Sequence, residues 1–268
     1  MHPLQMAGIR QFIGGLCYIL YFVFKRTAWP KGKDWIVILV LSFLNFLLSN
    51  TLSTWGVKYI SAGLGAIIGS IFPLWLVIIA MVGSKTKTKL NPKTIIGLLL
   101  GFTGICVIFF EYLQDFFNGS FRLGIFLSLA STWSWAFGTL YTKKQAVNFN
   151  PYFSLGFQMV ISGIVLNVIS GISGYSLPLE FIPWQGWALI GYLALFGSVI
   201  AFVAYLYALQ NLPTEQASLY AYINPIVAVM LGWIIFQEKL TAFIITGTLI
   251  TLYGVYLVNK SAGKISQS

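Results

Sequence analysis

Charged side chains are scarce in this chain, and acidic ones are the scarcest. Asp and Glu together account for 6 of the 268 residues, and all charged residues make up 8%. A soluble domain usually carries about a quarter charged residues. With hydrophobic residues at 58%, the chain has too few polar groups to cover a surface that faces water. We therefore expect an integral membrane protein rather than a soluble fold.

Histidine and cysteine are nearly absent as well. The one histidine is His2, and the two cysteines, Cys17 and Cys106, each lie inside an apolar stretch. No metal-binding spacing or disulfide framework is present, so we expect no metal and no cofactor. An enzyme acting within the membrane would need a nucleophile with a base, or metal ligands, at membrane depth. The sequence offers neither, so we expect no enzymatic activity.

Apolar stretches long enough to cross a bilayer, which takes about 20 residues, recur along the whole chain. This pattern predicts an all-α bundle of membrane-spanning helices. The candidate spans lie at 4–24, 35–55, 60–82, 94–111, 123–141, 152–174, 185–207, 216–236 and 242–259.

The net charge of +10 could suggest a nucleic-acid partner. We expect none, because the basic residues are confined to short loops between spans, a pattern that sets orientation in a membrane. Three basic residues, Lys58, Arg122 and Lys239, lie on one side. We expect the other side to be cytoplasmic, with the C-terminus inside and residue 1 outside, because it carries Lys25, Arg26, Lys31, Lys33, Lys85, Lys87, Lys89, Lys93, Lys143, Lys144, Lys260 and Lys264.

Two parts of the chain repeat the same pattern. Pro73 and Pro225 lie 152 positions apart, each midway along an apolar stretch. In the spans that follow, a pair of glycines seven positions apart occurs twice at an offset of 150: Gly97 and Gly104, then Gly247 and Gly254. Repeats of five helices must enter the membrane from opposite sides, and such inverted repeats are typical of secondary transporters.

The repeat predicts the organisation of the chain. We expect a first repeat at 1–118 that lacks its first helix, a second repeat at 119–260 and a cytoplasmic tail at 261–268. Subtracting the repeat offset from the fifth span places its counterpart before residue 1. The alternative is a nine-helix protein whose N-terminus faces outward.

Four stretches carry a resemblance to a known family. They are Pro3 to Phe12 with Ala7 and Arg10, Ala62 to Pro73, Leu123 to Tyr141 with Ser134-Trp135-Ala136, and Ala217 to Leu240 with Asn224-Pro225 and Glu238-Lys239-Leu240. In order and spacing the chain resembles the EamA-type permeases of the drug/metabolite transporter superfamily. The resemblance implies ten helices in two inverted five-helix repeats. The sequence departs from the family pattern at Gln237, where glycine is usual, and in the absent first helix.

Arg10 is the ionisable residue that lies within a predicted span. It falls about 10 Å along its helix, at 1.5 Å per residue. The side chain could extend to the membrane surface or pair with a neighbour, or it could belong to a transport pathway.

The other candidates for a substrate cavity are neutral. Polar and aromatic side chains that converge would suit a small organic substrate, although serine and asparagine also bond between packed helices. Pro73 and Pro225 are expected to kink their helices. The cavity candidates are Asn50, Ser70, Trp133, Trp135, Tyr205, Tyr222 and Asn224.

Together these features predict a multi-pass transporter in the cell membrane that moves a small organic metabolite or drug-like molecule. We expect an exporter or exchanger. Because no carboxylate lies deep in a span to serve a proton or sodium relay, a uniporter, or an antiporter coupled by substrate exchange, fits the sequence better than an ion-coupled transporter. The expected partners are membrane lipids and the small-molecule substrate, and the sequence indicates no oligomeric state. The alternative is a membrane scaffold or receptor that transports nothing.

Overall fold

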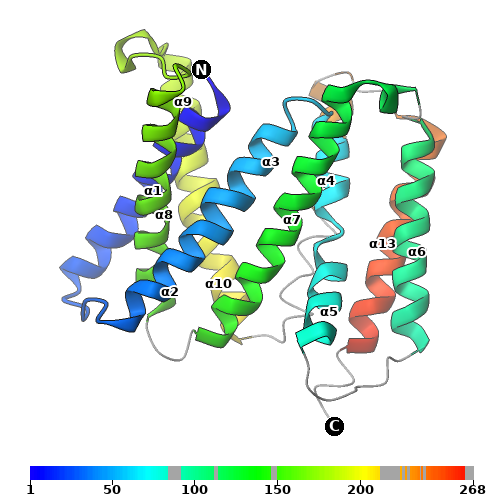
Figure 1. Cartoon of the computed structure of the whole chain (residues 1–268), viewed down its shortest axis with the longest axis horizontal. Helices are drawn as coiled ribbons and strands as arrows, with labels where there is room; N and C mark the ends of the chain where they lie inside the picture. The colour runs from blue at the N-terminus through cyan, green and yellow to red at the C-terminus, as the bar shows by residue number, and fades with distance from the viewer. Residues whose placement is uncertain are drawn as a thin grey trace. The chain divides into compact units, whose positions relative to one another are not determined.

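The computed structural model describes residues 1–83, 92–111, 114–145, 150–211, 224, 227, 230–235, 237 and 240–262. Its elements are helices, and no strand occurs within these residues (Figure 1). In chain order they are α1 (Pro3–Phe24), α2 (Lys33–Leu41), η1 (Ser42–Asn50), α3 (Thr51–Gly56), α4 (Ala62–Gly69), α5 (Phe72–Gly83), α6 (Pro92–Glu111), η2 (Asp115–Phe117), α7 (Gly119–Gln145), α8 (Pro151–Ile172), η3 (Leu179–Phe181), α9 (Trp184–Tyr192), η4 (Leu193–Ile200), α10 (Ala201–Asn211) and α13 (Ala242–Ala262).

These helices confirm the predicted membrane bundle. Eight of the nine predicted spans coincide with described helices, and the remaining one, 216–236, falls mostly outside the described residues. Five stretches are long and apolar enough to cross a membrane by length and composition: Pro3–Phe24, Lys33–Gly56, Gly119–Gln145, Pro151–Ile172 and Trp184–Asn211.

The chain forms two compact units, each assembled from segments far apart in the sequence. Unit 1 comprises Met1–Thr54 and Gly138–Asn211, and unit 2 comprises Trp55–Phe137 and Leu212–Ser268. Each unit therefore draws on both predicted repeats, 1–118 and 119–260. The repeat boundaries themselves stay a prediction.

In unit 1, α1 and α8 pack side by side and antiparallel (Figure 1). Glycines at their contact bring the two backbones together, as small residues commonly do between membrane helices. A Cβ built on Gly15 would lie 2.7 Å from the carbonyl oxygen of Gly156, and one on Gly163 would lie 2.9 Å from that of Gly8. Gly8 and Gly15 precede Gly156 and Gly163 by 148 positions each, so the two contacts are related by the same offset.

Two long helices of unit 1 contain a π-helical segment. One is η1 (Ser42–Asn50), continuous with α2 and α3, and the other is η4 (Leu193–Ile200), between α9 and α10. The starts of the two segments are 151 positions apart, close to the repeat offset. Wide turns of this kind are rare and often mark functional sites.

In unit 2, α6 and α13 form the corresponding antiparallel pair, seen side by side in Figure 1. The apolar core of this unit also includes Ile68 and Leu74 from α4 and α5, together with Ile108 and Val255 from the pair. The α4–α5 span is interrupted at Ser70 and Ile71. Pro73 is the second residue of α5, a position where the missing N–H of proline leaves no helix bond unmade.

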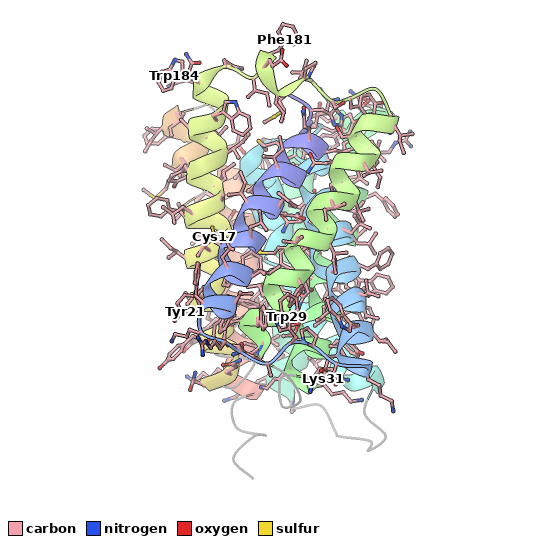
Figure 2. All side chains as sticks on the ribbon, turned by 90° about the vertical axis from the view of Figure 1, so that its left-hand side faces the viewer. Cys17, Tyr21, Trp29, Lys31, Phe181 and Trp184 are labelled. Carbon is pink, nitrogen blue, oxygen red and sulfur yellow. The ribbon has the colours of Figure 1, made fainter. Side chains whose placement is uncertain are left out.

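The two ends of unit 1 carry aromatic side chains. Figure 2 shows Phe181 and Trp184 at one end, and Tyr21, Trp29 and Lys31 toward the other. Aromatic residues at both ends of a bundle are typical of the two membrane–water interfaces. At the second end, an apolar cluster of Phe153, Phe157 and Ile38 is covered by Trp29 and Trp35, whose ring centroids lie 5.6 and 5.1 Å from that of Phe157.

Candidate functional site

Helix α1 carries polar side chains in its middle, where an apolar stretch would ordinarily continue. Gln11 is fully buried. Its Oε1 accepts a hydrogen bond of 2.5 Å from the hydroxyl of Ser162 in α8, and its Nε2 donates a longer bond of 3.5 Å to the carbonyl oxygen of Phe46 in η1. One glutamine side chain therefore joins α1 to α8 and to the first π-helical segment.

Tyr18 does the same for the second π-helical segment. It lies seven residues after Gln11 and therefore on the same face of α1, two turns further along. Its hydroxyl donates 2.6 Å to the carbonyl oxygen of Val199 in η4. Carbonyl oxygens of both π-helical segments thus accept bonds from α1, so this helix holds both irregular segments in place.

Arg10 lies beside these contacts. Its Nη2 donates a hydrogen bond of 2.7 Å to Oδ1 of Asn50, the last residue of η1. Its Nη1 lies 3.7 Å from the position that a Cβ would take on Gly197 in η4. The guanidinium therefore lies close to both π-helical segments. Arg10 and Asn50 were predicted from the sequence as two separate candidates, and in the structure their side chains form a hydrogen bond.

A second polar group lies on α7 and α10. The Thr139 and Tyr205 hydroxyls are 2.7 Å apart. The neighbouring Gly138 lies against the side chain of Asn45 in η1, so closely that a Cβ there would overlap the amide. The Oδ1 of Asn45 is buried without a hydrogen-bond partner in the described structure.

We call these side chains the unit 1 polar centre, because all belong to unit 1. The donors and acceptors come from α1, η1, α7, α8 and α10, and one guanidinium charge lies among them. Such a set suits binding of a polar small molecule. The members are Arg10, Gln11, Asn45, Asn50, Thr139, Ser162 and Tyr205.

The residue types in the unit 1 polar centre are not those that usually bind metal ions. Among the described residues, no group of three or more His, Cys, Asp or Glu side chains is close enough to do so. Guanidinium, amide and hydroxyl groups are hydrogen-bonding groups rather than the usual ligands of transition metals.

Three predicted cavity residues belong to unit 2 instead. The hydroxyl of Ser70 donates 2.6 Å to the carbonyl oxygen of Ile67 in the preceding helix α4, which favours a local structural role. Trp133 is 49% exposed, and its ring centroid lies 6.5 Å from that of Trp75 and 5.0 Å from that of Phe137. Trp135 is half-buried.

The remaining candidates lie in the last part of the chain. Asn224 is helical and exposed. Tyr222 and Pro225 lie outside the described residues.

Sequence reasoning missed Gln11, Ser162 and Tyr18, as well as the glycine contacts between α1 and α8. The glycines could have been found. Gly8 and Gly15 are seven positions apart, as are Gly156 and Gly163, which is the spacing that identified the pair in the later spans. For Gln11 and Ser162 the sequence gives no signal beyond a polar residue in an apolar stretch.

Most of the chain matches one protein family. The model of the EamA-like transporter family matches residues 1–110 and 122–260. The chain belongs to this family. It is therefore a multi-pass membrane protein of a transporter family, as its apolar helices also indicate.

Similar proteins from other organisms are also named as transporters. "Uncharacterized inner membrane transporter YedA" of Escherichia coli K12 is 29% identical over 86% of this chain and 72% of its own length. "Uncharacterized transporter" of Archaeoglobus fulgidus is 25% identical over 96% of this chain and 88% of its own. A solved crystal structure with a TM-score of 0.72 and 14% identity covers 99% of this chain and 90% of its own, which shows a shared fold.

Proposed function

We propose that this chain carries a small organic metabolite or drug-like molecule across the cell membrane, as an exporter or exchanger. The observation that supports this proposal most is the unit 1 polar centre. Its bonds at Gln11 and Ser162 lie near the middle of α1 and α8, where polar groups are costly in a membrane unless they have a function or a partner. Its hydroxyl and amide groups suit a neutral or charged organic solute better than a bare ion.

Exchange, rather than coupling to protons or sodium, is favoured by where the carboxylates lie. Asp34 is in the first turn of α2, Glu111 ends α6, and Asp115 and Glu180 lie in short 3-10 turns. Within the described helices none of them lies in the middle of a span. A proton relay ordinarily needs such a residue.

Of the predicted cavity residues in unit 1, we propose Asn50 and Tyr205 as substrate contacts, because both take part in the polar centre. We further propose that the C-terminus is cytoplasmic and residue 1 external, because the α1–α2 connection carries Lys25, Arg26 and Lys31, whereas no Lys or Arg occurs between α8 and α9.

The direct test is reconstitution. Purified protein in liposomes that are loaded with a metabolite extract is incubated with an isotope-labelled form of the same extract, and the washed vesicles are analysed by mass spectrometry beside protein-free liposomes. A transporter, whether it is a uniporter or an exchanger, enriches at least one labelled compound inside the vesicles. A scaffold or receptor that transports nothing leaves the two sets of vesicles alike, and that result would reject the proposal.

A further inference from the structure

We propose that Arg10 binds an anionic group of the transported molecule, so that the substrate carries a carboxylate or a phosphate. This inference rests on the proposed function and adds the chemical class of the substrate. It comes from what surrounds the guanidinium rather than from the presence of an arginine alone.

The first argument is charge. Arg10 follows the start of α1 at Pro3 by seven residues, which places it about 10 Å along the helix. Its guanidinium donates a hydrogen bond of 2.7 Å to the neutral side-chain oxygen of Asn50. Among the described residues, no carboxylate forms an ion pair with it, and the nearest in sequence, Asp34, accepts a bond from the backbone of Lys31. An amide oxygen satisfies one donor, but the positive charge has no counter-ion within the described part of the chain.

The second argument is geometry. A guanidinium presents five N–H donors in one plane and matches a carboxylate or phosphate through two parallel bonds. In Arg10, Nη2 is directed to Asn50, whereas Nη1 faces the backbone of η4 at Gly197. Gly197 has no side chain to cover that nitrogen. Asn50 thus fixes the plane of the guanidinium, and we assign it this positioning role in addition to the substrate contact proposed above.

A structural role for Arg10, or a bond to a lipid phosphate, makes a different prediction. Either role would help the protein fold or stay in place, so its loss would reduce transport of every compound and would act on the maximal rate. A bond to the substrate acts on affinity. The substrate concentration that gives half-maximal uptake therefore distinguishes the two explanations: it rises if Arg10 binds the substrate and is unchanged if Arg10 has a structural role.

Three variants test the inference in the reconstituted system. R10Q removes the positive charge. R10K keeps the charge but lacks the planar guanidinium that can form two parallel hydrogen bonds. N50D keeps the shape of the pair but places a carboxylate beside Arg10, where it acts as an internal counter-ion and competes with the substrate. N211D is the matched control, because Asn211 is exposed at the end of α10 and its amide bonds the carbonyl oxygen of Tyr207 in its own helix.

The wild-type protein should enrich compounds that carry a carboxylate or phosphate from the metabolite extract. For such a compound, R10Q and N50D should raise the half-maximal concentration at least about tenfold, the effect of about 1.4 kcal/mol. R10K should have a smaller effect, and N211D should match the wild type. If R10Q does not fold, N50D gives the answer by itself, because it introduces an ion pair rather than removing a partner.

Two results would overturn the inference and leave the proposed function intact. One is a wild-type protein that enriches compounds without any anionic group. The other is a lower maximal rate in R10Q and N50D at an unchanged half-maximal concentration. Enrichment of nothing over protein-free liposomes would reject the proposed function, and this inference with it.

Discussion

Gly97 in α6 lies against Gly254 in α13 so closely that a Cβ built on Gly97 would come within 2.6 Å of the carbonyl oxygen of Gly254. The reciprocal pair, Gly247 and Gly104, shows the same 2.6 Å. Gly97 and Gly104 of α6 correspond to Gly247 and Gly254 of α13, each 150 positions later. The two contacts are therefore copies of each other, which supports the predicted internal repeat as an inverted one.

The substitution G97A should destabilise the protein. The added methyl group would meet backbone atoms that cannot move away independently, and overpacking of this kind costs about 1–3 kcal/mol. Thermal unfolding in detergent should show a lower midpoint. The matched control is G191A in α9, where a Cβ would meet nothing within 4 Å and alanine should be neutral or slightly stabilising. Equal midpoints for the two variants would contradict the close contact.

The bond between Gln11 and Ser162 should be measurable as a coupling energy. Both side chains are buried, and interhelical hydrogen bonds in membrane proteins average about 0.6 kcal/mol and reach about 1.7. A double-mutant cycle of Q11L and S162A should give a value in the upper part of this range, since the bond is 2.5 Å long. Additive effects of the two substitutions would show that the bond contributes nothing.

P73A should slow transport and leave the amount of folded protein largely unchanged. Pro73 is the second residue of α5, just after the interruption at Ser70 and Ile71. Restoring an N–H would let α4 and α5 join into one helix and remove a point at which the span can bend. P225A is the companion variant in the predicted second repeat. Normal rates in both variants would make the prolines incidental.

Y205F should change substrate affinity and leave the pH dependence as it is. The substitution removes the hydroxyl that lies 2.7 Å from that of Thr139 and keeps the ring. The wild-type rate itself should vary little between about pH 6 and pH 8, the range in which an unperturbed histidine titrates, since the one histidine is His2 at the chain end. A steep wild-type profile that is lost on neutralising Glu111 or Glu238 would contradict a cavity without a titrating group.

A green fluorescent protein fused after Ser268 should fluoresce in intact cells, because that fusion matures in the cytoplasm. The expectation follows from the basic residues in the α1–α2 connection and in the C-terminal tail, because basic loops stay on the cytoplasmic side. A periplasmic alkaline phosphatase fused at the same place should be inactive. The opposite pattern would reverse the proposed orientation and place residue 1 in the cytoplasm.

The positions of the helices could be predicted from the sequence, because a membrane span consists of about 20 mostly apolar residues in a row. The sequence was also enough to find the repeated spacing of Gly97 with Gly104 and of Gly247 with Gly254. It did not predict that these glycines bring α6 and α13 together, because a spacing along the chain does not show which helix is the neighbour.

The polar centre could be predicted only in part. Arg10, Asn50 and Tyr205 attract attention as a charge, an amide and a hydroxyl inside apolar stretches. The partner of Gln11 depends instead on which face of α8 turns toward α1, and two glycine contacts decide that. The π-helical segments η1 and η4 carry no sequence signature, since a change from one helical bonding pattern to another leaves the apolar composition unchanged.

The packing of α1 against α8 also has a consequence for synthesis of the protein. The residues that meet are far apart in the sequence: Gly15 meets Gly156, 141 positions later, and Gly8 meets Gly163, 155 positions later. At about 5–20 residues per second, α1 leaves the ribosome roughly 7–30 s before its partner exists. During this interval Gln11 lacks the Ser162 hydroxyl, and the glycine face of α1 has no helix to cover it. A chaperone of membrane insertion would meet this helix early, and the nascent chain should be most open to misassembly until α8 has entered the bilayer.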